Sequence, residues 1–554
     1  MTNNWKKANI YQNGTDFLYE RTSSFMENTA LTDGIQKIKY KELYENIFQY
    51  ACMLQKLGIT KDDVIGICIE NTIEGVYLLY ALKIIGATTL GLSIFNNPYK
   101  MHRDIEMVKP STIITNENFY PLIKESSETL KIRTFLLSKN DNKNIAIPNL
   151  LEIVKRNKDH ELKKEAFSKD NIDTIIFTGG STGVHKGVAL NDKGLNAIAN
   201  SLDEVFILEP GMTHLGNIPF GHMIFGQFTL HYALSHGLTY YLTTNSLPND
   251  FLKDIIRIKA NGAMGGPVHW QNLIDNPILE KDSIPFLIQA GSGGETLKYM
   301  VETKTNKALK YGGSKAEVLN MLGLTEMSGL THIRDIHNNH LGTVGYPISC
   351  IKDIVVDPKI IEQAKPGEIV KLEEVPLGEK GLLLTTGESR LLCYYKNPEE
   401  TQKVLVFDGK EIWYNTGDLV TRISNTKEIE FAGRKKRNFV CNYDNIYPEQ
   451  VEEKVLEIPE IKEVTVTKVP DDTYQFLPVY HIALQNPTIN KDVVEQKINV
   501  QIEGTLGVNA LPGYIIYYEE LPKKQENKKL DVSLMEENGL KLLQDNKLVL
   551  VKKM

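Results

Sequence analysis

Cysteine is scarce in this chain, and its spacing shows no pairing pattern. The 554 residues include five cysteines, at positions 52, 68, 350, 393 and 441. Their number is odd and no CxxC pair occurs, so the sequence supports neither a zinc ribbon, nor a redox dithiol, nor a fold held by disulfides. This cysteine usage favours a reducing, cytoplasmic setting.

Long apolar runs are also missing. The longest apolar stretch, residues 76–95, is interrupted by Lys83, Gly86 and Gly91, and its pattern predicts a buried helix followed by a strand instead of a membrane span. The amino-terminal segment MTNNWKKANIYQNGTDF has no apolar run behind its lysines, so it lacks the pattern of a signal peptide. We therefore expect a soluble intracellular protein with no membrane span.

Neither sign of charge dominates. Lysine and arginine number 63, aspartate and glutamate number 70, and the formal net charge is −7. This balance does not favour nucleic acid or an anionic membrane as the main partner. Hydrophobic residues make up 42% and charged residues 24% of the chain, which is typical of a globular protein with a large core. A disordered chain and a collagen are thereby excluded.

Helix and strand patterns alternate through the first third of the chain. Apolar residues at helical spacing predict a helix over residues 40–57, and a short apolar run predicts a strand over 64–68. Asn71 is the expected cap of a second helix, which Gly86 ends, and another strand is expected over 87–94. Alternation of this kind indicates parallel sheet covered by helices, so we predict an α/β fold.

The pattern of apolar, charged and turn-forming residues changes in the later parts of the chain. Residues 154–171 are highly charged and predict an exposed connector, after which the alternation resumes. Shorter periods and recurring turn dipeptides over residues 351–429 indicate a small β-rich subdomain. Beyond Gly433 a basic run leads into a predicted compact α+β unit. We therefore predict a large N-terminal domain over residues 1–433 and a mobile C-terminal domain over residues 434–554.

The strongest local motif is a glycine-rich segment at residues 174–190, TIIFTGGSTGVHKGVAL. Backbone N–H groups beside glycines, hydroxyl donors and Lys186 together suit a polyphosphate. The segment is not a Walker A loop, because His185 occupies the position of its second glycine and Gly187 the position of its final hydroxyl. Residues 187–190 are expected to form a strand, and the segment alone is also compatible with a hairpin turn that binds nothing.

The glycine-rich segment resembles the YTSGSTGxPKG signature of the adenylate-forming superfamily. That family includes acyl-CoA synthetases, aryl-acid ligases, luciferase-like enzymes and non-ribosomal adenylation domains. Further segments resemble motifs of the same family in the same order: residues 291–297 (GSGGETL), 321–328 (MLGLTEMS), 342–347 (GTVGYP), 414–419 (YNTGDL) followed by Gly433-Arg434, and 446–452 (IYPEQVE). Because order and separation agree over nearly the whole chain, the sequence is identified as a member of this superfamily.

The resemblance implies a reaction of ATP, with Mg²⁺, in which a carboxylate attacks the α-phosphorus and gives an acyl-adenylate and pyrophosphate. Charge builds on phosphate oxygens, so we expect catalysis by positioning and electrostatics. Glu326 would bind Mg²⁺, which usually keeps several waters, and Thr325 would contact the α-phosphate. The β- and γ-phosphates would be held by Thr178, Gly179, Gly180, Ser181, Thr182, Gly183 and Lys186.

The resemblance also implies residues for the adenosine half of ATP. Asp418 would accept hydrogen bonds from the ribose hydroxyls, although an aspartate after Gly417 is also compatible with a simple Asx turn. Arg434 would add a ribose or phosphate contact from the domain boundary. The adenosine pocket would be formed by Gly293, Gly294, Glu295, Leu322 and Gly323.

The acid would bind in a pocket assigned by analogy with the family. His222, in the segment IPFGHMIFG, would lie at the carboxylate end, although a histidine in an apolar stretch also suits a buried core. Residues 219–226 contain no carboxylate that would hold a substrate amine, so an α-amino acid is disfavoured and a fatty or aryl acid is expected. An apolar cavity with little bulk at its neck would be lined by Gly265, Gly266, Val268, Trp270 and Gly291.

Two neighbouring lysines compete for the role of the family's C-terminal catalytic lysine. The segment LPKKQENKKLD resembles LPKTxxGKxD, but the glycine before the lysine is missing. Counting without a gap selects Lys528, and aligning the trailing aspartate selects Lys529, which we prefer. Lys436 occupies the hinge position about which the small domain rotates between half-reactions. Both segments are also compatible with ordinary exposed, charged turns.

Some positions depart from the family's motifs, and these departures bear on which group accepts the acyl group in the second half-reaction. Leu322 replaces the tyrosine that usually stacks on adenine, and His185 replaces a proline in the phosphate loop. Tyr443 replaces a glycine in the segment that approaches pantetheine, where its ring would narrow the thiol tunnel. The acceptor therefore stays open between coenzyme A, the phosphopantetheine of an acyl or peptidyl carrier protein, and a group other than a thiol.

The resemblance predicts an ATP-dependent carboxylic-acid ligase that transfers the acyl group of an acyl-adenylate to a pantetheine thiol. The alternative within the family is an adenylating enzyme with a non-thiol acceptor, including luciferase-like oxidation. The alternative outside catalysis is a relative that only binds a nucleotide or acyl group. The presence of Lys186, Glu326, Asp418 and Arg434 argues against this last reading.

Overall fold

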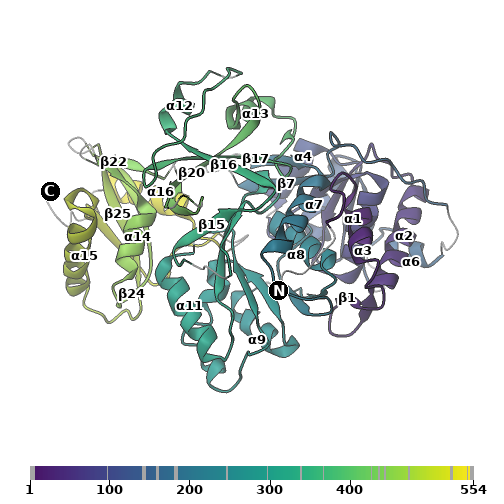
Figure 1. Ribbon diagram of the computed structural model, residues 1–554, viewed down its shortest axis with the longest axis horizontal. Helices are drawn as coiled ribbons and strands as arrows, with labels where there is room; N and C mark the ends of the chain where they lie inside the picture. The colour runs from purple at the N-terminus through teal and green to yellow at the C-terminus, as the bar shows by residue number, and fades with distance from the viewer. Residues whose placement is uncertain are drawn as a thin grey trace.

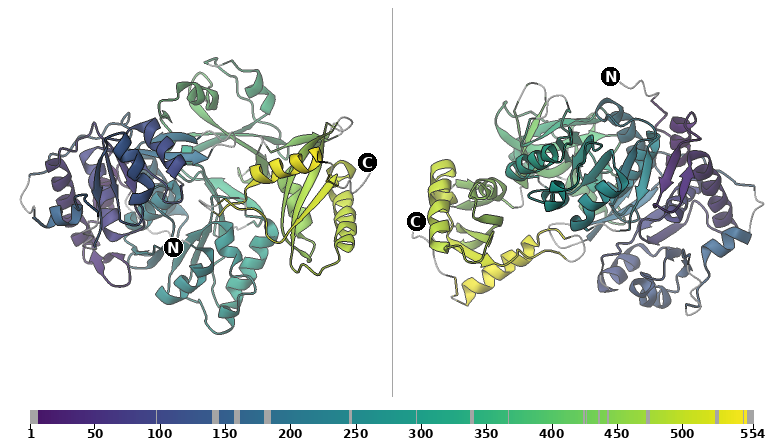
Figure 2. Two further views of the ribbon diagram at one scale, coloured as in Figure 1. Left: turned by 180° about the vertical axis from the view of Figure 1, so that it is seen from behind. Right: turned by 90° about the horizontal axis from the view of Figure 1, so that it is seen from below.

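The computed structural model arranges the chain as two large sheets with helices between and around them, followed by a smaller C-terminal domain (Figures 1 and 2). Within the described residues, no helix is both long and apolar enough to cross a membrane. The structure describes residues 7–96, 98–139, 145–156, 161–179, 185–244, 247–295, 297–336, 340–365, 367–423, 425, 427–434, 437–441, 444–471, 475–524, 528–545 and 547–548.

The first sheet is formed by the amino-terminal part of the chain and carries the glycine-rich motif. Its strands pair in parallel, except that β8 (His185–Leu190) is antiparallel to both of its neighbours, β7 (Thr174–Gly179) and β18 (Cys393–Tyr394). Its strands in spatial order are β18 (Cys393–Tyr394), β8 (His185–Leu190), β7 (Thr174–Gly179), β4 (Thr88–Gly91), β3 (Val64–Cys68), β5 (Thr112–Thr115) and β6 (Arg133–Leu136). The strand predicted after the glycine-rich loop is therefore confirmed as β8.

The second sheet joins a parallel part to an antiparallel part. The parallel strands are β1 (Thr29–Thr32), β10 (Thr239–Leu242), β9 (Thr213–Gly216), β11 (Gly262–Gly265), β12 (Gln289–Ser292) and β13 (Val318–Leu322), with β2 (Lys37–Lys39) antiparallel at the edge. The antiparallel strands are β14 (His332–Ile333), β15 (Thr343–Pro347), β16 (Ile351–Val356), β17 (Lys380–Gly387), β19 (Leu405–Phe407), β20 (Ile412–Arg422) and β21 (Ile429–Arg434). The predicted β-rich subdomain is thus continuous with the second sheet through β14 and β15.

Helices fill the space between the sheets and cover their outer faces. The shared core between the sheets includes side chains of α1 (Gly14–Thr22), α2 (Tyr40–Lys56), α3 (Ile73–Ile85), α7 (Asp192–Ser201) and α8 (Ile224–Ser235). The outer face of the first sheet packs against α4 (Pro98–Val108) and α5 (Tyr120–Thr129). The outer face of the second sheet packs against α9 (Pro248–Ile258), α10 (Pro267–Gln271) and α11 (Tyr299–Tyr311). Shorter helices are α6 (Leu150–Arg156), α12 (Pro358–Gln363) and α13 (Pro398–Val404).

The helix predicted to follow β3 is present, but its predicted cap is wrong. Thr72 caps α3, because its hydroxyl accepts a hydrogen bond from the Gly75 N–H at 3.1 Å. The Asn71 side chain instead donates to the carbonyls of Gly216 (3.1 Å) and Ile218 (3.0 Å). Both side chains are good cap formers, and the tertiary contact with the second sheet selects between them.

The C-terminal domain has a core of its own. A three-stranded sheet of β24 (Ile461–Asp471), β25 (Gln475–Leu484) and β26 (Tyr514–Tyr518) packs with α14 (Pro448–Leu456) and α15 (Lys491–Leu506). The hairpin of β22 (Phe439–Cys441) and β23 (Asp444–Ile446) and the helix α16 (Val532–Gln544) complete it. The α+β unit predicted beyond Gly433 is confirmed, whereas the boundary between residues 433 and 434 stays a prediction.

A buried ion pair joins three helices of the inter-sheet core. Lys83 of α3 bonds to Asp192, the first residue of α7, and both side chains are almost fully buried. The second Asp192 carboxylate oxygen accepts from the Gly14 N–H of α1 at 2.8 Å. Burial, together with the charge of Asp192, raises the pKa of the nearby Asp173 to about 8. The ammonium of Lys83 therefore lies close to two carboxyl groups, those of Asp192 and Asp173.

We expect Lys83→Met to destabilise the N-terminal domain by about 3–5 kcal/mol, because it leaves a buried carboxylate unpaired. The measurement is the urea or thermal unfolding midpoint. Lys164→Met is the matched control, since it breaks an exposed ion pair with Asp16 and should change stability by less than about 1 kcal/mol. Equal midpoints for the two variants would contradict the assigned role of Lys83.

Candidate active site

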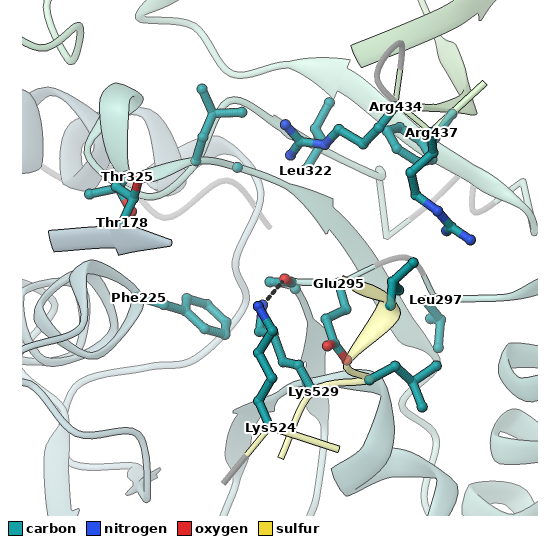
Figure 3. Close-up of a pocket in the computed structure, with 18 of the residues that line it drawn as sticks. Thr178, Phe225, Glu295, Leu297, Leu322, Thr325, Arg434, Arg437, Lys524 and Lys529 are labelled. Atoms are coloured by element: carbon teal, nitrogen blue, oxygen red, sulfur yellow. Dashed lines mark hydrogen bonds between the residues drawn. The ribbon is translucent and has the colours of Figure 1, made fainter. Parts of the chain in front are cut away.

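A cavity of about 2140 Å³ lies where the two sheets and the C-terminal domain meet. The carboxyl ends of β7, β9, β12 and β13 open into it, as expected for ligand sites in α/β sheets. The predicted residues that line it are Thr178, Lys186, His222, Gly266, Val268, Gly293, Gly294, Glu295, Leu322, Gly323, Thr325, Glu326, Arg434, Lys528 and Lys529. Figure 3 shows part of this set converging from several elements, with Thr178, Glu295, Leu322, Thr325, Arg434 and Lys529 labelled.

Some predicted residues lie elsewhere or are not described. Gly180, Ser181, Thr182, Gly183, the hinge Lys436 and Tyr443 lie outside the described residues, and Gly179 ends β7 in backbone pairing with His185. Asp418, Gly265, Gly291 and Trp270 are described but lie behind the residues that line the cavity. Of the glycine-rich motif, the structure therefore describes the two flanking strands.

Lys186 marks the end of the cavity next to the glycine-rich segment. Its side chain is 11% exposed and forms an ion pair with Glu400, which lies on α13. Its ammonium also lies 4.8 Å from the centre of the Tyr394 ring. Both neighbours line the cavity. Neither Tyr394 nor Glu400 was predicted, because they are close to Lys186 only after β18 pairs with β8.

Glu326 faces the same end of the cavity from a tight turn. It belongs to the 3₁₀ turn η3 (Thr325–Met327), which follows β13, and its Oε1 accepts a hydrogen bond from the Tyr394 hydroxyl at 2.8 Å. The turn requires glycine at position 323, since a Cβ there would lie 1.9 Å from the carbonyl oxygen of Gly329. The motif spacing therefore has a steric origin, and it brings Thr325 and Glu326 to the cavity together.

Asp418 and Arg434 face each other across adjacent strands. They are paired residues of β20 and β21, and the Arg434 Nε lies 2.6 Å from Asp418 Oδ1. Asp418 is fully buried, and neither of its carboxylate oxygens accepts a hydrogen bond within the described chain. Burial raises the pKa of Asp418 to about 6 despite the arginine. The Arg434 ion pair is therefore the main balance of the Asp418 charge, and the carboxylate is a strong hydrogen-bond acceptor.

His222 lies on the cavity wall between the end of β9 and the start of α8. The imidazole is buried, and neither ring nitrogen has a hydrogen-bond partner within the described residues. Its ring meets that of Phe95 edge-to-face at 5.5 Å. Burial lowers the pKa of His222 to about 3, so the ring is neutral at ordinary pH. A neutral imidazole with free nitrogens suits a polar group at the head of an otherwise apolar pocket.

The acyl pocket expected by analogy is only partly formed by the predicted residues. Gly266 and Val268 line the cavity. Trp270 is fully buried, contacts Phe251 edge-to-face at 5.0 Å, and donates its indole N–H to the carbonyl of Gly291 at 2.8 Å. The indole therefore supports the strand behind the pocket instead of forming the pocket surface, which differs from the expectation.

The C-terminal domain reaches the cavity through lysine side chains, among them Lys528 and Lys529. Lys529 donates from its Nζ to the carbonyl of Gly294 at 2.5 Å, as the dashed line in Figure 3 shows. Lys528 also lines the cavity, and its backbone has φ of 59°, a strained value for lysine. In the described part of the chain Lys529, not Lys528, is hydrogen-bonded to the adenosine-pocket segment.

Further contacts hold the C-terminal domain in this orientation. Lys298, just before α11, pairs with Glu452 of α14 at 3.2 Å and donates to the carbonyl of Val464 at 3.2 Å. The backbone N–H of Tyr299 donates to Glu453 at 3.1 Å. These contacts and the Lys529 bond lie around one cavity, so its shape depends on how the two domains are docked.

Comparison with known proteins identifies the family. Residues 18–395 match the model of the AMP-binding enzyme family. The chain is 24% identical over 553 residues to a long-chain-fatty-acid–CoA ligase of Bacillus subtilis (strain 168), covering 94% of this chain and 93% of the relative. It is 24% identical over 517 residues to a luciferin 4-monooxygenase of Photuris pensylvanica, covering 90% of each. An anthranilate CoA ligase solved with anthranoyl-AMP has a TM-score of 0.84 at 18% identity, covering 97% of this chain and 99% of that one.

The match covers more than half of the chain, so this protein belongs to the AMP-binding enzyme family. The adenylate-forming superfamily predicted from the motifs is thereby confirmed, and the protein is an adenylate-forming ligase. The structural likeness at 18% identity concerns the fold, and it confirms the predicted α/β core with a C-terminal α+β part.

We expect Trp270→Phe to lower stability by about 1–3 kcal/mol, because it removes the indole N–H that donates to the buried Gly291 carbonyl. The ratio of kcat/KM between a longer and a shorter acid should stay unchanged, since the ring lies behind the pocket. Val268→Ala, at a residue that lines the cavity, is the contrasting variant and should change that ratio with little loss of stability. A shift of acid preference by Trp270→Phe as large as that by Val268→Ala would show that the indole reaches substrate.

Proposed function

We propose that the protein is an ATP-dependent carboxylic-acid–coenzyme A ligase. In the first half-reaction the acid's carboxylate oxygen bonds to the α-phosphorus of ATP, and the bond from that phosphorus to the bridging oxygen breaks. Acyl-adenylate and pyrophosphate result. In the second half-reaction the thiol of coenzyme A loses its proton and attacks the acyl carbon, and AMP leaves. The observation that carries this proposal is a single cavity lined by Lys186, Glu326, Arg434 and Lys529.

The phosphate end of the cavity suits a polyphosphate with Mg²⁺. Lys186 supplies positive charge and Thr178 a hydroxyl, both at the edge strands that flank the glycine-rich segment. Glu326 is the carboxylate available to Mg²⁺, since one of its oxygens accepts from Tyr394 and leaves the other. No cluster of three or more acidic, histidine or cysteine side chains that could hold a metal occurs in the described residues. A single carboxylate fits Mg²⁺, which takes phosphate and water as its other ligands and would neutralise charge on the phosphates.

The nucleoside end of the cavity suits ribose and adenine. The ion pair with Arg434 favours the ionised form of Asp418, and a carboxylate has several lone pairs that can accept hydrogen bonds. We propose that the ribose hydroxyls reach it once Arg434 moves aside or shares the carboxylate. Leu322 and the Gly293–Gly294 backbone would form the adenine wall by shape and apolar contact. The acid would enter beside His222, whose neutral ring would orient the carboxylate without binding it as a counter-ion.

The acid class and the acceptor are proposed from the pocket and the relatives. Val268, Phe225 and Met321 give the pocket apolar walls, which suit a fatty or an aryl acid. One relative is named for long-chain fatty acids and one structural neighbour was solved with anthranoyl-AMP, so both classes stay in the proposal. The names of these two proteins also favour coenzyme A over a carrier protein. A cytoplasmic location, as the cysteine usage favours, completes the proposal.

A second function is supported by one specific finding. The chain has a luciferin 4-monooxygenase among its relatives at the same level of identity as the fatty-acid ligase. An adenylate whose acceptor is not a thiol is therefore the alternative. It shares the first half-reaction with the main proposal and differs only in the second.

The test is pyrophosphate release with ATP and Mg²⁺ across a panel of fatty, aryl and amino acids, each with and without coenzyme A. We expect release with a fatty or aryl acid that multiplies when coenzyme A is added, together with formation of the acyl-CoA thioester. Slow, acid-dependent release that coenzyme A does not change would favour a carrier protein or a non-thiol acceptor. ATP binding with no release for any acid would overturn the catalytic proposal.

We expect Lys529→Met to slow adenylate formation by about 10²–10³-fold, as for the loss of one charge-stabilising donor. Thioester formation from added acyl-adenylate should be nearly unchanged, because the lysine is proposed to act on the phosphates and not on the thiol. Lys528→Met is the matched neighbour and should keep adenylation within a few-fold of wild type. An equal loss in both half-reactions, or a larger loss for Lys528→Met, would count against this assignment.

A further inference from the structure

The positively charged end of the cavity already contains an anion supplied by the protein. Glu400 forms an ion pair with Lys186 and accepts a second hydrogen bond from Lys403 Nζ at 2.5 Å. Lys186 is 11% exposed, and a cation this buried is unfavourable without a partner. These two lysines lower the pKa of Glu400 to about 2, so the carboxylate is ionised over the whole working range of pH.

The position of Glu400 is built into the fold. The antiparallel pairing of β18 with β8 brings residues 393–394 beside residues 188–189. The helix α13 starts directly afterwards, and the Asn397 side chain caps it by accepting from the Glu400 N–H at 3.1 Å. Thr401 Oγ1 accepts from the Tyr394 N–H at 2.9 Å and fixes the helix to β18. Glu400 therefore occupies a defined place in the first turn of α13, where the helix dipole also favours a carboxylate.

ATP and Glu400 make competing demands on Lys186. Under the proposed function, the terminal phosphates of ATP are the ligands of this lysine, and they carry the same sign of charge as Glu400. Both anions cannot occupy its contact geometry at once without repulsion. The exchange leaves Glu400 satisfied, because Lys403 remains bonded to it after Lys186 turns to the phosphates. The Glu400 side chain is also 27% exposed, so water reaches it.

We propose that Glu400 is an exchangeable counter-ion of Lys186 that competes with polyphosphate for this lysine and so sets the affinity for ATP and pyrophosphate. The inference rests on the proposed function, since it assumes that Lys186 binds the terminal phosphates. Glu400 is a positioning residue: it holds Lys186 through their ion pair and takes it back when pyrophosphate leaves. The consequence is weaker ATP binding in exchange for easier release of pyrophosphate.

Comparing the binding of ATP and pyrophosphate with that of AMP distinguishes competition by Glu400 from a general change in the cavity. ATP and pyrophosphate both present a polyphosphate to Lys186, whereas AMP has no β- or γ-phosphate. Removing the competing charge should therefore tighten binding of ATP and pyrophosphate together and leave AMP binding unchanged. A nonspecific rearrangement of the cavity would change AMP binding as well.

The experiment is calorimetric measurement of the dissociation constants of ATP, pyrophosphate and AMP with Mg²⁺ and without acid, on the full chain. We expect Glu400→Gln to bind ATP and pyrophosphate about three- to tenfold more tightly than wild type, the range of a partly exposed charged contact. AMP should bind both proteins equally. Glu399→Gln is the matched control, since this exposed glutamate is the preceding residue on α13 and should bind all three ligands like wild type.

A double-mutant cycle removes the remaining ambiguity. If Glu400 acts through Lys186, Glu400→Gln should have no effect on ATP affinity in a Lys186→Met background. Glu400→Ala, which also removes the charge, serves as a second variant if Glu400→Gln proves unstable by its unfolding midpoint, and the same tightening is expected.

The outcomes distinguish this inference from the proposed function. Failure of the wild-type protein to bind ATP at all would overturn the proposed function. Wild-type binding of ATP with unchanged affinity in Glu400→Gln would overturn the inference alone. Weaker binding in Glu400→Gln would also overturn it and would assign the carboxylate to the Mg²⁺–polyphosphate complex. Equal tightening of AMP, or persistence of the effect in the Lys186→Met background, would likewise contradict it.

Discussion

The hydrogen bond from the Lys529 ammonium to the Gly294 carbonyl connects the two domains at the point where the cavity closes. A carbonyl can turn toward the cavity there because Gly294 has φ of +85°, which glycine adopts without strain. The pairing of Lys298 with Glu452 stabilises the same orientation from outside the cavity. The C-terminal domain therefore contributes a wall of the site, and the chemistry assigned to the cavity depends on this docking.

Two of the charged groups that line the site are paired with carboxylates of the protein itself. Lys186 pairs with Glu400 and Arg434 pairs with Asp418. Antiparallel strand pairing brings both pairs together: β18 with β8 joins segments far apart in the sequence, whereas β20 with β21 joins consecutive strands. A ligand that uses these side chains must exchange one partner for another, so its net affinity is smaller than its contacts alone would indicate. Under the proposed function, the same internal partners would assist the departure of products.

The prediction of local structure succeeded where the hydrophobic pattern was strong and failed where a tertiary contact decided. The helix predicted over residues 40–57 is α2, and the strand over 64–68 is β3, because apolar periodicity alone specifies such buried elements. Asn71 was the wrong cap, since its amide is used by two carbonyls of the second sheet. Trp270 was expected to form the pocket surface, but a large indole with a single N–H donor is satisfied in the core by a backbone carbonyl.

The sequence by itself determined the family and the class of reaction and suggested the candidate residues, because segments that resemble the family's motifs occur in the family's order over nearly the whole chain. Tertiary structure decided which side chains meet. Lys186 finds Glu400 and Tyr394 only through the pairing of β18 with β8. The backbone N–H of Lys524 donates to the carbonyl of Lys529, and the side chain of Lys529, not that of its neighbour Lys528, reaches the Gly294 carbonyl. Contacts between residues hundreds of positions apart leave no spacing pattern in a single sequence, because they arise from sheet register and domain docking.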